Sequence, residues 1–82
     1  MFPTTKKYVV LTAENFFYQC YNALLRSETP TGKEASYKAA ILYRDVLLMD
    51  FPKHKDAINE CWNNFKPVFI ERLVEVGVEI NG

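Results

Sequence analysis

The sequence predicts an all-α fold: a three-helix antiparallel bundle whose third helix is kinked or broken at Pro67. Proline and glycine punctuation divides the 82 residues into three long segments. Within each segment, apolar residues recur at steps of three and four, the period of a helix with one buried face. We expect helices at about residues 13–27, 32–50 and 54–76, within a single helical domain over residues 1–82.

The first helix is predicted to begin after Thr12, whose hydroxyl can cap a free backbone N–H. Leu11 before this cap and Phe16 four residues after it have the spacing of a hydrophobic staple. Beyond them, apolar and polar residues separate onto opposite faces. The apolar face holds Phe17, Cys20, Tyr21 and Leu24, and the polar stripe holds Asn15, Gln19, Asn22 and Arg26.

The second helix is predicted from a capping box and an apolar run. Thr31 and Glu34 have the T-x-x-E spacing in which each side chain satisfies a free backbone N–H. Residues 39–49 then include only two charged side chains, Arg44 and Asp45. Because a helix that is apolar on most sides is usually covered, we expect this helix to lie between its neighbours.

The third helix has an apolar face that continues across Pro67 without changing phase. Proline removes one backbone donor, so either one long helix kinks there or two short helices meet; we favour the kink. Gly77 is placed to end the helix in the left-handed conformation, with Val78 folding back on the last turn.

An alternative at the C-terminus is a strand. Apolar residues alternate with glutamate or glycine, which is strand periodicity, and residues 7–11 could supply a pairing strand. The alternating apolar residues are Val74, Val76, Val78 and Ile80. The alternative fold is therefore α+β with a short terminal two-stranded ribbon.

Composition favours a reducing, cytoplasmic protein without strong electrostatic attraction to nucleic acid. Ten basic and ten acidic side chains cancel. Cys20 and Cys61 can make at most one bridge, which is far from a disulfide scaffold, and we expect both thiols to be free and buried. We expect no signal peptide at the N-terminus and no membrane span.

Candidate sites for metal or catalytic chemistry fail on spacing. His54 and Cys61 are seven residues apart, about 10 Å along a helix, which is too far to chelate one ion. A structural zinc site needs four ligands. A phosphate loop at Gly32-Lys33 would need glycine where Ser27 stands and Ser or Thr in place of Glu34. We therefore predict no metal, no cofactor and no enzymatic activity.

Aromatic residues carry the functional signal. Six phenylalanines, five tyrosines and one tryptophan are plentiful for 82 residues, and most of them are expected to fill the core. Trp62 is interpreted as a core anchor where the second and third helices meet. Phe16, Tyr18 and Tyr21 cover more of the first helix than one interior stripe needs, and such residues beside amides are typical of a protein-binding surface. We expect these three residues to contact a partner protein or a second copy of the chain.

Basic residues suggest the alternative function. Lys6, Lys7, Lys53 and Lys55 form a basic tip that could serve a nucleic-acid accessory protein. Acidic neighbours should cancel most of the field of this tip, namely Asp50, Asp56 and Glu60. Nucleic-acid binding is therefore the less favoured interpretation.

One segment resembles a known family. Residues 39–65 resemble the joint between two tetratricopeptide-type repeats, where a small residue, aromatic and aliphatic positions, an acidic end and a proline follow one another. Ala40, Tyr43, Leu47, Asp50 and Pro52 fill these places, and Phe51 is one residue more than the family has before the proline. The resemblance implies a helical hairpin.

These observations together favour a small non-enzymatic regulator or adaptor. It would act by binding another protein or itself, as a homo-oligomer, through the aromatic surface of the first helix. Short accessory chains of this kind include phage-type inhibitors and lysis regulators, an expectation that rests on chain size.

Overall fold

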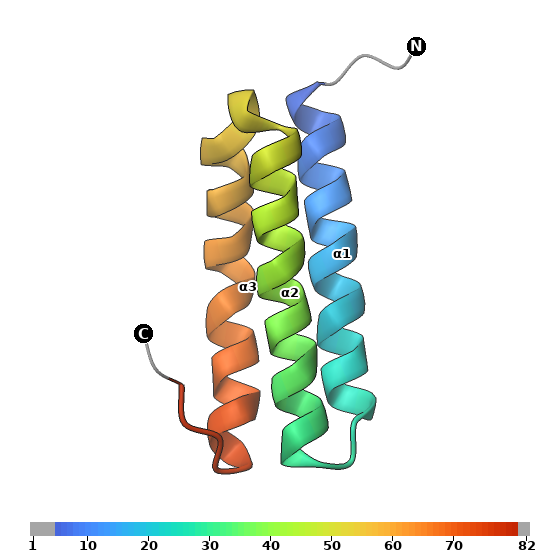
Figure 1. Cartoon of the computed structure of the whole chain (residues 1–82), viewed down its shortest axis with the longest axis vertical. Coiled ribbons are helices and arrows are strands. Elements are labelled where there is room, and N and C mark those ends of the chain that lie inside the picture. Colours follow the sequence, from blue (N-terminus) through green and yellow to red (C-terminus); the bar gives the residue numbers. More distant parts are fainter. Residues whose placement is uncertain (1–4, 81–82) are drawn as a thin grey trace.

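A computed structural model describes residues 5–80 and shows three helices side by side (Figure 1). They are α1 (Lys6–Arg26), α2 (Pro30–Asp50) and α3 (Lys55–Glu75), and the short 3-10 helix η1 (Pro52–His54) precedes α3. Each long helix contacts both others, and the bundle measures 43 × 24 × 17 Å. The predicted antiparallel three-helix bundle is confirmed.

The alternative with a terminal ribbon is wrong. Within residues 5–80 no strand forms. Residues 7–11 lie in α1, where Val9 is fully buried, so this segment serves the core as a helix. Val78 and Ile80 follow the end of α3 without pairing and pack against the core as partly buried side chains.

Helix α1 begins earlier than the sequence predicted. Thr5, not Thr12, is its cap, and the Thr5 hydroxyl accepts a hydrogen bond from the backbone N–H of Tyr8 at 3.1 Å. The Thr12 hydroxyl instead donates to the carbonyl of Tyr8 at 2.9 Å inside the helix. Burial explains the extension, because Val9 continues the buried face of Ala13 and Phe17 by one more turn.

Helix α2 also begins earlier, because the capping threonine is Thr29. Its hydroxyl accepts from the backbone N–H of Gly32 at 3.0 Å, and Pro30 occupies the first helical turn, where no N–H is needed. The predicted capping box at Thr31 is therefore wrong. The helix ends at Asp50, and η1 and α3 complete the helical hairpin expected for residues 39–65.

Helix α3 is continuous through Pro67, so the two-helix alternative is wrong. Pro67 lies on the exposed side, where water can satisfy the carbonyl that a proline cannot bond. The helix ends at Glu75, and Gly77, two residues later, has the predicted left-handed conformation with a φ of 80°. The N–H of Val78 donates to the carbonyl of Leu73 at 3.0 Å, and that of Gly77 donates to Val74 at 3.0 Å, which is a Schellman motif.

Trp62 lies at the centre of the core, as the sequence predicted. Its side chain is 3% exposed, and its ring centroid lies 5.2 Å from that of Phe17, 6.0 Å from that of Tyr37 and 5.9 Å from that of Phe69. The Arg44 guanidinium lies over the indole at 5.6 Å. Trp62 therefore joins all three helices.

Candidate protein-binding surface

The three predicted contact residues do not share one surface. Phe16 points toward α2 and stacks on Tyr43 with 4.6 Å between ring centroids. Tyr21 packs edge-on against the core ring of Phe69 at 5.7 Å, and its hydroxyl accepts a hydrogen bond from Arg72 Nε at 3.2 Å. Both are half-buried. Of the three, only Tyr18 is exposed, at 58%.

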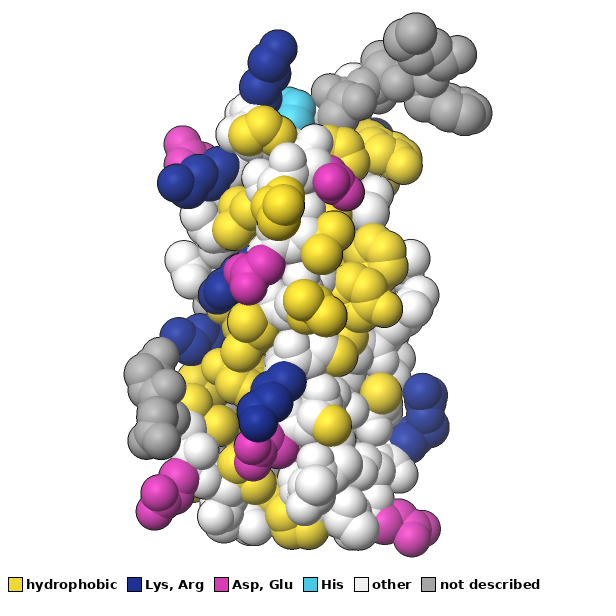
Figure 2. Space-filling view, viewed as in Figure 1, with side chains coloured by type: hydrophobic (Ala, Val, Ile, Leu, Met, Phe, Trp, Pro, Cys, Tyr) yellow, Lys and Arg dark blue, Asp and Glu magenta, His cyan; other side chains and the backbone are white. Residues whose placement is uncertain are grey.

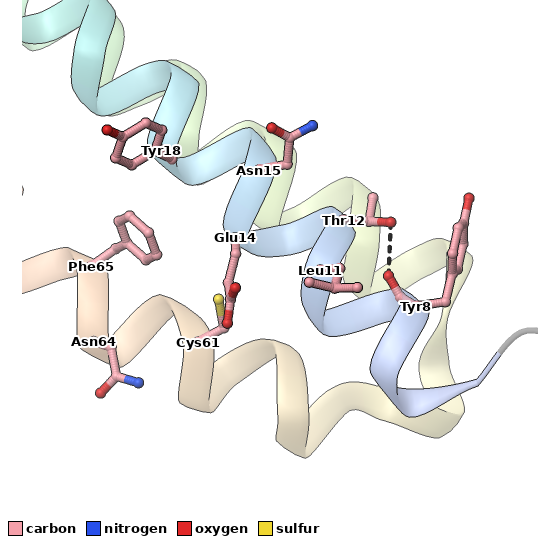
Figure 3. A pocket seen from close by; sticks show the side chains of 9 residues that line it. All are labelled: Tyr8, Leu11, Thr12, Glu14, Asn15, Tyr18, Cys61, Asn64 and Phe65. Carbon is pink, nitrogen blue, oxygen red and sulfur yellow. Dashed lines mark hydrogen bonds between the residues drawn. The ribbon is translucent and has the colours of Figure 1, made fainter.

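Tyr18 lines an open groove of about 930 Å³ between α1 and α3, which we call the α1 groove. Figure 3 shows Tyr18 on α1 and Phe65 on α3 lying on opposite walls of this groove. The lining residues are Tyr8, Leu11, Thr12, Glu14, Asn15, Tyr18, Cys61, Asn64 and Phe65. Aromatic and aliphatic side chains thus lie beside two amides, as in many protein interfaces.

The charge in the α1 groove is negative only. Glu14 is the single acidic residue among the lining residues, and none of them is basic. The Glu14 carboxylate lies beside the Cys61 thiol on the groove floor (Figure 3). Burial, with smaller contributions from Glu14 and Glu60, raises the pKa of Cys61 to about 11. The thiol is therefore protonated near neutral pH and is a poor nucleophile.

Cys20 and Cys61 are both buried, and neither takes part in a disulfide bond. They lie on the buried faces of α1 and α3, as predicted. Burial also raises the pKa of the Cys20 thiol.

Sequence reasoning missed Tyr8 and Leu11, because it placed both before the start of the first helix. They are 51% and 55% exposed and form the N-terminal part of the α1 groove. The sequence does hold a pattern that indicates this surface. Leu11, Tyr18 and Leu25 follow one another at intervals of seven, so they share one helix face. All three are exposed.

Helix α2 was expected to be covered, yet its outer face is open. In a three-helix bundle each helix has only two neighbours, so one face of α2 meets solvent. On that face lie Ala35, Leu42, Val46 and Met49, with the partly buried Ala39 at its edge. We call these five residues the α2 seam. Leu42 is 64% exposed and Met49 81%. Figure 2 shows hydrophobic side chains gathered over α2 and its border with α1.

The antiparallel arrangement brings the four predicted basic residues to one end of the bundle (Figure 1). Lys6 and Lys7 begin α1, while Lys53 and Lys55 lie where η1 meets α3. Acidic residues occupy the same end, namely Asp50, Asp56 and Glu60. The four basic residues thus lie at one end of the bundle, but the neighbouring carboxylates largely cancel their positive field.

Two features are absent from residues 5–80. In this part of the chain, no group of three or more His, Cys, Asp or Glu side chains is placed to hold a metal ion. None of the described helices is both long and apolar enough to cross a membrane.

Comparison with protein-family models found no match to this chain. Comparisons with curated proteins and with solved structures found none either.

Proposed function

We propose that this protein is a small adaptor or regulator that binds another protein through the α1 groove. The observation that carries the proposal is the exposure of three large side chains, Tyr8, Leu11 and Tyr18, along one groove. Large apolar side chains gathered in one exposed depression are typical of interaction sites.

The groove chemistry indicates what kind of segment would bind. A helix in such a groove places apolar side chains at steps of three and four against Leu11 and Tyr18 on one wall and Phe65 on the other. Because Glu14 is the only charged lining residue, a lysine or arginine of the partner would complement it. The expected partner segment is therefore an amphipathic helix with a basic residue on its apolar border.

A displayed library of short peptides tests this proposal on the full chain. We expect enriched peptides to carry apolar residues at helical spacing and a lysine or arginine. Tyr18→Ser should weaken their binding at least about tenfold, because an exposed aromatic at an interface centre is the usual hot spot. Glu14→Gln should weaken it less and reduce its dependence on salt.

The matched control is Leu42→Ser. It removes from the α2 seam a side chain that is 64% exposed, close to the 58% of Tyr18. It should leave peptide binding unchanged. Enriched peptides that bind the Tyr18→Ser and parent proteins equally well would overturn the proposal, as would a selection that enriches no peptide.

A further inference from the structure

We propose that the α2 seam is a self-association surface on which a second copy of this chain packs antiparallel, α2 against α2. This goes beyond the proposed function because it concerns a different face of the molecule. The seam residues Ala35, Ala39, Leu42, Val46 and Met49 alternate in steps of four and three, the pattern of a two-helix seam. Ala35, Leu42, Val46 and Met49 lie on the exposed side of α2, and Ala39, at the edge of the seam, is partly buried and also packs against the core.

The distribution of side-chain size along the seam is self-complementary. The N-terminal half has only small residues, Ala35 and Ala39, and the C-terminal half has the large ones. When Ala39 of one copy lies opposite Leu42 of the other, Ala35 lies opposite Val46, and the two-fold axis repeats both pairs. Each layer then joins one small and one large side chain, so the helices can pack at constant separation.

A parallel arrangement lacks this fit. It would place Ala35 against Ala35 and Leu42 against Leu42, so that the layers would be narrow at one end of the seam and wide at the other. Natural helix pairs lose packing contacts wherever such a gap opens. The size gradient along α2 therefore selects the antiparallel orientation.

Charges beside the seam favour the same orientation. Lys38 flanks its small half and Asp45 flanks its large half, on the same side of the helix. In the antiparallel pair, Lys38 of each copy lies near Asp45 of the other, giving two complementary contacts. Within one chain Lys38 pairs with Glu34 at 2.9 Å and Asp45 with Arg44 at 2.8 Å, both at the surface, where such pairs are weak.

The seam is long, and its three large side chains are exposed. From Ala35 to Met49 the seam covers about 21 Å of helix at 1.5 Å per residue. Leu42, Val46 and Met49 are 64%, 43% and 81% exposed along it. Tyr43, which is 40% exposed and stacked on Phe16, borders the seam on the α1 side and extends the apolar surface.

Disulfide trapping tests both the contact and its orientation. Ala35→Cys and Val46→Cys proteins are made separately and mixed under mild oxidation. In the antiparallel pair these positions face each other, so the mixture should yield a mixed disulfide. Each variant alone should yield none, because its own two cysteines would lie about 16 Å apart along the axis. The parent protein, whose cysteines are buried, is the background control.

Sedimentation across a dilution series measures the association itself. The parent should form a dimer, and Leu42→Glu should raise its dissociation constant about 100-fold or more, because the leucine is removed from both copies. The matched control is Leu11→Glu in the α1 groove, which should leave the dimer intact while losing peptide binding. Circular dichroism should show both variants folded, since both leucines are exposed.

Two results would overturn the inference. A parent that is monomeric throughout the dilution series removes the surface as an association site, whatever the outcome for the α1 groove. A disulfide-linked dimer of Ala35→Cys alone, with no mixed product, shows a parallel contact instead.

Reversing the charges beside the seam tests the proposed contact between Lys38 and Asp45. Lys38→Asp or Asp45→Lys alone should weaken the dimer, and the double variant should recover its affinity.

Discussion

The ring of Phe16 on α1 lies nearly parallel to the ring of Tyr43 on α2, with 4.6 Å between centroids and 15° between planes. This stack closes the border between the two helices. Phe16 is therefore part of the packing of the bundle, whereas Tyr18, two residues later, is 58% exposed.

Replacing these two residues should affect the stability of the fold to different degrees. Phe16→Ser should destabilise the fold by about 1–3 kcal/mol, because it removes a partly buried ring and its stacking partner's contact. Tyr18→Ser should change stability by no more than about 0.5 kcal/mol. Urea unfolding followed by far-ultraviolet circular dichroism measures both. Equal effects of the two substitutions would contradict the packing role of Phe16.

Trp62 should be indispensable to the bundle. Trp62→Ala removes a side chain that contacts Phe17, Tyr37 and Phe69, and should cost about 3–5 kcal/mol of the free energy of unfolding. For a small domain, a loss of this size leaves a large fraction of the molecules unfolded. Thermal melts by circular dichroism test it, with exposed Asn63→Ala as the control. A cooperative melt close to that of the parent would refute the anchoring role.

Both thiols should resist labelling in the folded protein. Cys20 and Cys61 are 7% and 6% exposed, so a thiol reagent should react slowly until denaturant is added. Mass spectrometry after timed labelling separates the two sites. Rapid native labelling of either cysteine, or an intact disulfide under mildly reducing conditions, would contradict the burial of these side chains.

Alkaline pH should weaken the fold through Cys61. Its folded pKa of about 11 lies above its ordinary value of 9.0, so the folded state favours the neutral thiol. This contribution to stability is complete below pH 9.0 and is lost as pH rises toward 11. The free energy of unfolding should thus fall more steeply in the parent than in Cys61→Ala across this range. Parallel pH profiles would disprove the assignment.

Gly77 should be sensitive to backbone strain alone. A side chain at φ 80° costs about 1–2 kcal/mol, and a Cβ built there meets no atom within 4 Å. Gly77→Ala should therefore destabilise the fold by that amount, while Gly77→Asn, which tolerates the left-handed region better, should cost less. Urea melts of the pair give the comparison. An alanine variant as stable as the parent would show that the Schellman turn opens at little cost.

The number of helices, the faces that they bury and the glycine turn after α3 follow from the sequence alone. These features depend on local chemistry and on apolar periodicity, which any chain with this pattern shares. The sequence also identified the buried positions of Trp62, Cys20 and Cys61, since each lies on an apolar stripe. It did not determine where α1 and α2 begin: threonines at several positions could cap, and burial of Val9 decided between them for α1.

Packing between the helices determines which aromatic side chains remain exposed. Phe16, Tyr18 and Tyr21 are similar in sequence terms, but two of them meet rings on neighbouring helices, Tyr43 and Phe69. The same reason explains the open face of α2. Apolar residues on most sides predict a covered helix, but three packed helices can each cover only two directions, so the α2 seam remains exposed to solvent.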